Sequence, residues 1–288
     1  MNPDVSVLTV TYNSATVIER TIESVERQRG VRTELVIVDN RSTDNTAQLV
    51  GSRDGVTFIE SPDNLGFGRG NNLGFAATKG RFVLLLNPDA HLEGDDALQR
   101  MSEHLDARPE VGIVGPKLLH ADGRLQARPR LSYPGERHVD TDLSALPGEI
   151  AWIIGAAMFV RRSVYEAIQG FDEDFFMYGE ETDFCLRARK SGCKIDYLPE
   201  VAVRHVEAVS SRGRDPYDVW MAKQSSLFLL YAKAYGPEAA RRLVRRELAR
   251  ARLRLITLGL TRILADQPDK HAKYRATRDA ARRWLAAE

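Results

Sequence analysis

The first 90 residues alternate between short apolar, β-branched runs and segments with helical spacing, and this alternation constrains the fold more than any other feature. The apolar runs predict buried strands at residues 5–10, 35–38, 56–60 and 82–86. Helices are expected between them, over residues 17–27, up to residue 50 and up to residue 78. Strands that alternate with helices are joined by right-handed crossovers. The sequence therefore predicts an α/β fold with a mostly parallel sheet flanked by helices.

Polar residues follow the first two predicted strands. Thr11, Tyr12 and Asn13 come after the first strand, and Asp39 and Asn40 come after the second. Ligands of such sheets bind beyond the carboxyl ends of the strands. Tyr12 can stack on a base, Asn13 can bond the edge of that base, and Asp39 can accept a hydrogen bond from a pyrimidine N3–H or a ribose hydroxyl. An ordinary turn between strand and helix is the alternative for both segments.

The fourth strand ends in Asn87-Pro88-Asp89, where three leucines deliver a carboxylate to the sheet edge. A diphosphate is a poor leaving group unless its charge is neutralised. Mg²⁺ or Mn²⁺ held by a carboxylate and bridging the phosphates provides that charge. The segment thus predicts a metal site at Asp89 beside Asn87, and a plain Asx-Pro turn is the alternative.

Residues 64–72 are rich in glycine and asparagine. Gly66, Gly68 and Gly70 would let the backbone approach a ligand closely, while Asn64 and Asn71 offer polar contacts. No Gly-Lys-Ser/Thr follows, and the GxGxxG spacing is absent, so neither a Walker loop nor a dinucleotide site is expected. A flexible connector is the alternative.

A second acidic segment spans residues 171–183, where aromatic residues surround carboxylates at a predicted helix start. Burial and crowding of like charges should raise the pKa of at least one carboxyl. Glu181 or Glu180 could then act as the base that takes a proton from a sugar hydroxyl. Asp183 has a simpler alternative, an acid in the first helical turn.

His205 ends a short predicted strand, and a charged loop with Arg212 and Arg214 follows. Imidazole beside carboxylate suits Mn²⁺, and the two arginines could clamp phosphate once a donor is bound. A structural histidine and a solvated linker are the alternatives.

The other elements of the second half are less regular. Helices are expected at residues 95–108 and 180–191, and from 217 to the end with breaks at Gly236-Pro237 and Gln267-Pro268. Strands are expected at residues 150–160, 194–198 and 201–205. Residues 123–147 are expected to form a long mobile loop.

Charge and composition restrict the partners. The 288 residues carry a net charge of +1, which gives no hint of nucleic acid, although residues 236–288 hold 14 Arg or Lys against 6 Asp or Glu. The two cysteines are expected to be reduced, as in the cytosol. No secretory leader is expected, and the longest apolar run, 11 residues, is too short to span a bilayer. These features predict a cytoplasmic protein that could bind peripherally to the inner face of the membrane.

The basic C-terminal helices have three interpretations. Leucines lie among the arginines at positions Leu243, Leu248, Leu255 and Leu258. This pattern fits a packed helical appendage, a homodimer interface, or peripheral docking on an anionic membrane that holds a lipid-linked acceptor.

Five segments occur in the order typical of one family: VSVLTVTYNS, VIVDNRSTDNT, NLGFGRGNN, LLLNPDA and MYGEETDFCLRARKSG. Over roughly residues 5–215 the chain resembles glycosyltransferase family 2, and it is most similar to bacterial cell-envelope rhamnosyltransferases and galactofuranosyltransferases. The resemblance implies a GT-A fold over residues 1–215, with a nucleotide-binding half at 1–90 and an acceptor and catalytic half at 91–215. Residues 216–288 would form a helical region.

The resemblance also implies roles for single residues. Tyr12, Asp39 and Asn71 would surround the nucleotide, Asp89 would be the metal-binding acid of a DxD motif, and His205 would be a second metal ligand. Glu181 matches the second acid of the ED motif, usually the base. The chain departs from the family pattern twice, because Asn87 replaces the first Asp of DxD and Glu180-Glu181 replaces ED, so either glutamate can be the base. The acceptor is assigned to Gly155, Ala156 and Asp183.

These observations predict an inverting, metal-dependent glycosyltransferase. L-Rhamnose from dTDP-rhamnose is the favoured donor sugar, because the Ser-x-Gly-Arg-Asp-Pro stretch at residues 211–216 is similar to that of the rhamnosyl group. The acceptor would be a hydroxyl of a cell-envelope glycan or lipid-linked saccharide. A transferase for UDP-galactofuranose or UDP-N-acetylglucosamine is the alternative donor class. A nucleotidylyltransferase is disfavoured, since no basic glycine-rich loop lies near the N-terminus, and a non-catalytic nucleotide-sugar scaffold is the rival without enzymatic activity.

Overall fold

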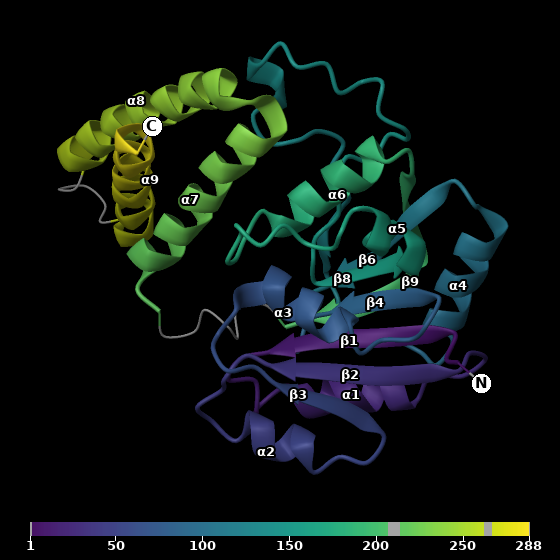
Figure 1. Ribbon diagram of the computed structural model, residues 1–288. Coiled ribbons are helices and arrows are strands. Elements are labelled where there is room, and N and C mark those ends of the chain that lie inside the picture. Colours follow the sequence, from purple (N-terminus) through teal and green to yellow (C-terminus); the bar gives the residue numbers. More distant parts are fainter. Residues whose placement is uncertain (1, 207–213, 262–266, 288) are drawn as a thin grey trace.

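Figure 1 shows the computed structural model, which describes residues 2–206, 214–261 and 267–287. Its N-terminal half contains four parallel strands in the order β3-β2-β1-β4. The strands are β1 (Val5–Thr11), β2 (Thr33–Asp39), β3 (Val56–Glu60) and β4 (Phe82–Leu86). The helices between them are α1 (Ile18–Glu26), α2 (Thr46–Gly51) and α3 (Gly66–Phe75). The predicted alternation is confirmed, and the bounds of β3 and β4 are those expected from their apolar runs.

The second half extends the same sheet with mixed strand directions, so the sheet continues from β4 through β8, β6 and β9 to β5, and β7 pairs with β6. β8 runs antiparallel to both β4 and β6, whereas β6 and β9 are parallel. These strands are β5 (Ala90–Leu92), β6 (Val111–Leu119), β7 (Leu125–Ala127), β8 (Ala157–Arg161) and β9 (Lys194–His205). The helices of this second half are α4 (Ala97–Ala107), α5 (Arg162–Ala167), α6 (Glu180–Lys190) and the 3₁₀ turn η1 (Glu136–His138).

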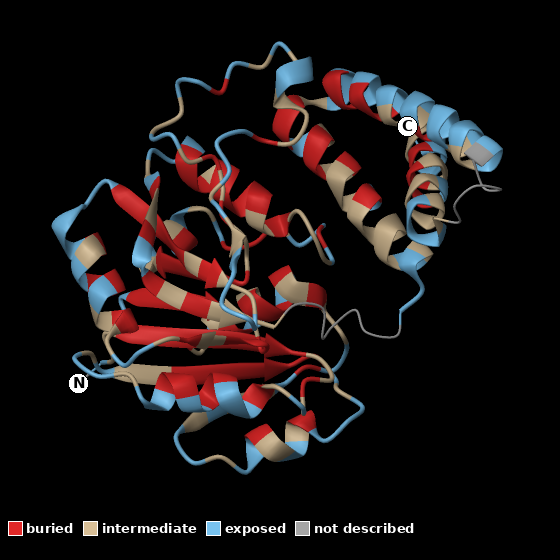
Figure 2. Cartoon of the chain, turned by 180° about the vertical axis from the view of Figure 1, so that it is seen from behind, coloured by how far each residue is buried: buried red, intermediate tan, exposed pale blue. Residues whose placement is uncertain are grey.

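Two apolar clusters cover the two faces of the sheet. Successive side chains of β1 alternate between them, so Val7 packs in the cluster with α1 and α4, and Leu8 packs in the cluster with Tyr165, Phe171 and Phe184. Figure 2 shows that the strands between these layers are buried along most of their length. A strand buried on both faces has no polar alternation, which explains the continuous apolar runs in the sequence.

The glycine-rich stretch is a helix, not a flexible connector. A Cβ at Gly74 would lie 2.3 Å from Cδ1 of Leu8, and one at Gly70 would lie 2.7 Å from Cγ1 of Val10. The glycines of α3 therefore let the helix lie directly on β1 and β2. The expectation that they open the backbone to a ligand is wrong for Gly68 and Gly70, and only Gly66 lines a cavity.

The apolar run at residues 150–160 is not one strand. β8 begins at Ala157, and the preceding Gly155 and Ala156 lie in a loop whose Ala156 carbonyl accepts a hydrogen bond from the Asn87 amide at 3.0 Å. The two strands expected at 194–198 and 201–205 are in fact the single strand β9. Its pairing with β6 shifts register between Pro116 and Lys117, which absorbs the interruption near Pro199.

The segment predicted to be a long mobile loop is anchored to α6. The buried guanidinium of Arg189 donates to the carbonyls of Leu146, Pro147 and Gly148 at 3.1, 3.0 and 2.8 Å. The Tyr133 hydroxyl donates to the Ala151 carbonyl at 2.8 Å. These bonds satisfy loop carbonyls that would otherwise be buried without partners.

Three helices form the C-terminal region: α7 (Pro216–Tyr235), α8 (Pro237–Thr261) and α9 (Pro268–Ala286). The predicted breaks are confirmed. Leu243 is buried in a third apolar cluster, together with Phe228 and Tyr231 of α7, and Leu248 packs against it. Leu243 and Leu248 therefore point inward, and Leu255 and Leu258 are half-buried. The apolar side chains exposed on α8 are Leu253, Ile256 and Leu260. No helix of the described residues is long and apolar enough to cross a membrane.

Candidate active site

A cavity of about 460 Å³ opens at the carboxyl ends of β1 and β4. This volume suits a small-molecule ligand. Twelve of the residues singled out in the sequence line it, and they come from both halves of the sheet: Thr11, Tyr12, Asn40, Asn64, Gly66, Asn87, Asp89, Gly155, Ala156, Glu180, Glu181 and His205. The fold thus brings together most of the separately predicted motifs.

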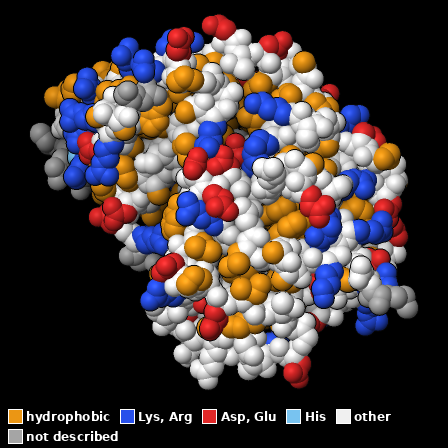
Figure 3. Space-filling view, viewed as in Figure 1, with side chains coloured by type: hydrophobic (Ala, Val, Ile, Leu, Met, Phe, Trp, Pro, Cys, Tyr) orange, Lys and Arg blue, Asp and Glu red, His pale blue; other side chains and the backbone are white. Residues whose placement is uncertain are grey.

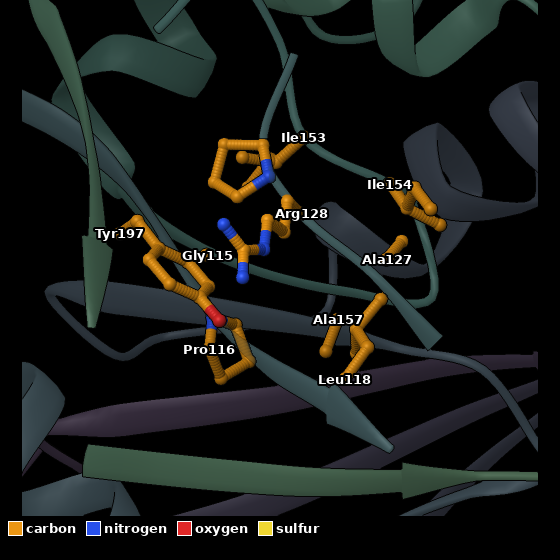
Figure 4. Close-up of a pocket in the computed structure, with 10 residues that line it drawn as sticks. Gly115, Pro116, Leu118, Ala127, Arg128, Ile153, Ile154, Ala157 and Tyr197 are labelled. Carbon is orange, nitrogen blue, oxygen red and sulfur yellow. The ribbon is translucent and has the colours of Figure 1, made fainter. Parts of the chain in front are cut away.

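A second, much smaller cavity lies beyond Ile154, which lines both (Figure 4). It holds about 20 Å³ between Arg128, Tyr197 and the strand segment around Pro116. That space is enough for a water molecule and too small for a sugar. The larger cavity is therefore the candidate active site.

Asp89 and His205 meet at one end of the larger cavity. Oδ1 of Asp89 lies 3.2 Å from Nε2 of His205, and both side chains are largely buried. The pairing of β5 with β9 sets this distance, because Ala90 lies opposite His205 and the Val206 amide donates to the Asp89 carbonyl at 2.9 Å. From the other side, the Thr21 hydroxyl donates to the Pro88 carbonyl at 2.8 Å and fixes the turn.

The opposite edge of the His205 ring contacts Gln126 on β7. Nδ1 lies 3.1 Å from Oε1 of Gln126 and 3.0 Å from its Nε2. When Oε1 accepts the Nδ1 proton, the lone pair of Nε2 points toward the cavity. Outer contacts of this kind orient metal-ligating histidines. Nδ2 of Asn87 lies 3.4 Å from Nε2, so the residue that replaces the first acid of DxD remains beside the imidazole.

These groups fit a divalent cation that shares its coordination with a substrate. Across the described residues, no group of three or more His, Cys, Asp or Glu side chains could hold a metal ion. Mg²⁺ and Mn²⁺ at phosphate-transfer sites often use one or two protein ligands, with phosphate oxygens and water completing the shell. Asp89 and His205 supply that smaller set.

Glu180 and Glu181 begin α6 on another wall of the cavity. Glu180 is buried and its Oε2 has no hydrogen-bond partner, whereas Oε2 of Glu181 accepts from the Gly179 amide at 3.1 Å. Burial raises the pKa of both carboxyls, and the neighbouring Glu181 raises that of Glu180 further. Three backbone N–H groups favour the charged form of Glu181 and one favours that of Glu180, so Glu180 holds the proton of the pair more strongly.

Backbone conformation aims these two acids into the cavity. Tyr178 and Gly179 both adopt left-handed conformations, with φ of 70° and 86°. Such a conformation is uncommon for tyrosine, and residues of this kind concentrate at functional sites. Gly155 lies opposite, where an added Cβ would be 3.3 Å from Cβ of Glu181. The loop before β8 therefore limits the space in front of Glu181.

Asp39 does not line the cavity, and its carboxylate accepts hydrogen bonds within the protein. Oδ1 accepts from the hydroxyls of Thr11 and Ser42 at 2.9 and 2.6 Å, and Oδ2 accepts from the Ser42 amide at 2.8 Å. Asn13 is similarly engaged, since its Oδ1 accepts from the Thr43 amide at 2.7 Å. Both residues hold the edge that presents Thr11 and Tyr12 to the cavity.

Asn40 differs from these two. Its Nδ2 donates to the Gly66 carbonyl at 2.8 Å, but its buried Oδ1 has no partner. Asn64 lines the same wall, and its Oδ1 accepts from the Gly66 amide at 3.0 Å. An unpaired amide oxygen in a cavity wall is a ready acceptor for a ligand N–H.

The remaining predicted residues lie apart from the cavity lining. Asn71 is buried and donates to the Phe67 carbonyl at 2.9 Å, and Asp183 is buried in an ion pair of 2.7 Å with Arg187. Arg212 lies outside the described residues. Arg214 is exposed, and its charge lowers the pKa of the Tyr178 hydroxyl against the larger effect of burial, which raises it. Arg214 is therefore near the cavity without lining it.

Two contributors were not found by the sequence analysis. Lys223 lines the cavity from α7, a helix assigned to the C-terminal region, and Gln126 contacts His205 from the segment expected to be a loop. Neither residue belongs to a motif. Their positions depend on packing between distant parts of the chain.

Comparisons with known proteins find glycosyltransferases. A family model described as Glycosyl transferase family 2 matches residues 6–169, and one described as the N-terminal domain of galactosyltransferase matches residues 136–210. The chain is 30% identical to the low-salt glycan biosynthesis hexosyltransferase Agl10 of Haloferax volcanii, over 77% of this chain and 73% of the relative. It is 28% identical to the N-acetylglucosaminyl-diphospho-decaprenol L-rhamnosyltransferase of Mycobacterium tuberculosis, over 80% of this chain and 84% of that protein.

The fold is shared with a solved structure, that of the mannosyltransferase PcManGT from Pyrobaculum calidifontis in complex with GDP-Man and Mn²⁺. The TM-score is 0.60 at 22% sequence identity, and the match covers 100% of this chain and 75% of that one. At this identity the similarity concerns the fold alone.

Proposed function

The chain belongs to glycosyltransferase family 2 and has the GT-A fold, and we propose that it transfers one sugar from a nucleoside diphosphate to an acceptor hydroxyl with inversion. One observation carries the proposal. Asp89 and His205 line the same cavity as Glu180 and Glu181, so groups suited to a leaving diphosphate and to an attacking hydroxyl share one space.

Glu181 is the proposed base. In its ionised form it takes the proton of the acceptor hydroxyl as that oxygen bonds to the anomeric carbon, and the bond from this carbon to the donor diphosphate breaks. Glu180 stays protonated, because its burial and the charge of Glu181 raise its pKa. Two adjacent carboxyls with separated pKa values are a common arrangement for proton transfer. A fixed geometry of donor and acceptor supplies a further part of the rate.

Asp89 and His205 would hold a Mg²⁺ or Mn²⁺ ion. When bound, the ion neutralises charge on the diphosphate. The contact between Gln126 and Nδ1 of His205 orients the ring for this role. The Mn²⁺ named with the mannosyltransferase of the same fold supports the proposal.

The nucleotide would bind where β1 and β2 end. Oδ1 of Asn40 can accept an N–H from the base, and Tyr12 offers a ring for stacking. Thymine and uracil both carry an N3–H, so this contact suits dTDP and UDP alike. We favour L-rhamnose as the sugar, supported by the mycobacterial rhamnosyltransferase relative, with UDP-galactofuranose or UDP-N-acetylglucosamine as the alternative donors.

The acceptor is proposed to be a glycan on a lipid carrier, reached from an anionic membrane surface. Leu253, Ile256 and Leu260 are 62%, 62% and 74% exposed on α8. At 100° per residue these side chains fall within one narrow arc of the helix. Exposed aliphatic side chains grouped in this way mark an interaction surface.

The charge on α8 favours a lipid surface as the partner. Its outer face carries the exposed arginines Arg242, Arg245, Arg246 and Arg252, and only Glu238 and Glu247 are acidic on the helix. Figure 3 shows basic and hydrophobic side chains gathered at this end of the molecule, and Figure 2 shows the outer face of α8 exposed. Basic residues beside apolar ones bind anionic bilayers.

A thermal-shift panel with Mn²⁺ tests the function. dTDP-rhamnose, UDP-galactofuranose, UDP-N-acetylglucosamine and GDP-mannose would each be measured with and without the ion. We expect one pyrimidine donor to raise the melting temperature in the presence of Mn²⁺ and to be hydrolysed slowly when no acceptor is present. Stabilisation without hydrolysis or transfer would favour the non-catalytic scaffold. No stabilisation by any donor would contradict the proposal.

A further inference from the structure

Lys223 of α7 brings a cation into the active-site cavity from outside the nucleotide-binding half. Its Nζ lies 4.9 Å from the ring centroid of Tyr178 and 5.2 Å from that of Trp220. Lys273 of α9 reaches the same Trp220 ring at 4.4 Å. Of these groups, Lys223 and Tyr178 line the cavity, and Trp220 and Lys273 do not.

No carboxylate neutralises Lys223 among the residues that the structure describes, where its recorded contacts are the two rings. Glu180 and Glu181 line the same cavity, yet the pKa shifts of both come from burial, their own interaction and backbone contacts. Lys223 is thus not the counter-charge of the proposed base. A half-buried ammonium held by rings has remaining hydrogen-bond donors and can bind an anion.

Lys223 and Tyr178 line one wall of the cavity together. Lys223 contacts Tyr178, which precedes the glutamates by two residues, whereas the donor diphosphate is assigned to Asp89 and His205. The acceptor must approach the glutamates for its hydroxyl to lose a proton. An anion bound between Lys223 and the glutamates would belong to the acceptor.

We propose that Lys223 binds a phosphate on the acceptor, so that the protein selects a glycosyl phosphate or diphosphate over a neutral sugar. Tyr178 and Trp220 hold the ammonium group in place and leave its N–H donors directed at phosphate oxygens. This inference rests on the proposed function, and it adds the chemical class of the acceptor. Lys223 is a specificity-determining residue here and takes no part in proton transfer.

Two synthetic acceptors test the inference. One is an alkyl diphosphate of N-acetylglucosamine, and the other is the neutral alkyl glycoside with the same chain. Each is titrated by calorimetry into the protein preloaded with Mn²⁺ and the nucleoside diphosphate of the active donor. The wild type should bind the diphosphate acceptor at least about tenfold more tightly than the glycoside, as expected for one charge-assisted contact.

Lys223→Gln should remove this preference and leave binding of the neutral glycoside unchanged, and Lys223→Arg should restore most of it. Lys233→Gln is the matched control, because Lys233 lies on the same helix but pairs with Asp172 and Asp174. Melting temperatures of all variants show whether they fold.

The inference is overturned if the wild type does not prefer the diphosphate acceptor, or if Lys223→Gln keeps the wild-type preference. A weakened affinity for the donor in Lys223→Gln would also overturn it, since the cation would then serve the donor. Mn²⁺-dependent donor binding and donor hydrolysis report separately on the proposed function, so a failure of that function is recognised independently.

Discussion

Oδ1 of Asp89 and Nε2 of His205 lie 3.2 Å apart because β5 pairs with β9 at the edge of the sheet. The two residues come from opposite ends of the catalytic region, and neither forms a metal site alone. Asn87, in the position of the first acid of DxD, contacts the same imidazole nitrogen at 3.4 Å. Asn87 thus lies beside the histidine that we propose as the second metal ligand.

Asp89→Asn and His205→Gln should each abolish the Mn²⁺-dependent part of donor binding. Each removes one of two protein ligands while nearly preserving shape. Calorimetry of the active donor with Mn²⁺ and with a chelator measures the effect.

Gln126→Leu should weaken donor binding by about tenfold, because the His205 ring loses the contact that orients it.

His91→Gln is the control for the metal ligands, since His91 lies on β5 but does not line the cavity. It should bind donor as the wild type does. If His205→Gln retains full Mn²⁺-dependent affinity, Asp89 holds the ion without the imidazole and the proposed pair is wrong.

Glu181→Gln should bind the donor normally and lose about 10²- to 10⁴-fold in transfer rate, the usual contribution of a general base. Burial raises the pKa of Glu181, and the base acts only when ionised. The wild-type rate should therefore rise with pH through a midpoint above the usual range of a glutamate carboxyl. Single-turnover transfer across pH measures both effects.

Glu180→Gln distinguishes the two glutamates. If Glu180 stays protonated, the amide mimics its working state, and most of the activity should remain. The roles are reversed if Glu180→Gln loses transfer while Glu181→Gln keeps it.

Gly74→Ala should destabilise the fold by about 1–3 kcal/mol, the usual cost of inserting a methyl group into a packed core. The new Cβ would meet Leu8 at 2.3 Å and Val38 at 2.7 Å. Chemical denaturation gives the free energy of unfolding. Gly259→Ala is the matched comparison, because nothing lies within 4 Å of its Cβ position on α8, and it should stabilise by up to about 1 kcal/mol. Equal effects of the two substitutions would show that α3 does not depend on close contact with the sheet.

Replacement of Leu253, Ile256 and Leu260 by serine should abolish sedimentation with vesicles that contain phosphatidylglycerol. Wild-type protein should bind these vesicles, bind phosphatidylcholine vesicles weakly, and be released by salt, because arginines contribute about 1 kcal/mol each near an anionic surface. Leu131→Ser, at a residue 70% exposed elsewhere, is the control.

Light scattering of the same proteins separates the two interpretations of this face. The exposed face of α8 is a dimer interface if the wild type forms dimers, the triple variant is monomeric, and both bind vesicles equally.

The sequence predicted the strands best where local pattern and tertiary environment agree. The β-branched runs of β3 and β4 could be placed because burial on both faces demands continuous apolar residues. Helix α3 was misread in part, since glycine has a low helix propensity and only contact with Leu8 and Val38 explains its use. The start of β8 was misplaced because a cavity-lining loop is as apolar as a strand.

Some residues of the candidate site could be predicted from the sequence and others could not. Residues at strand ends and at the start of α6 were identified because they belong to short contiguous motifs. Lys223 and Gln126 could not be identified, since their neighbours lie far away in the chain and only the completed fold brings them to the cavity. Asp39 was singled out from its motif position, and the structure adds that its carboxylate accepts hydrogen bonds from Thr11 and Ser42.

The placement of Lys223 on α7 has an evolutionary consequence. The donor end of the cavity is built from paired strands, where an insertion or deletion of one residue shifts the register and turns side chains to the other face. The wall supplied by α7 is a helix surface, which tolerates substitution without altering any strand. Descendants of a common ancestor could therefore exchange one acceptor for another by altering this late segment while inheriting the donor chemistry intact.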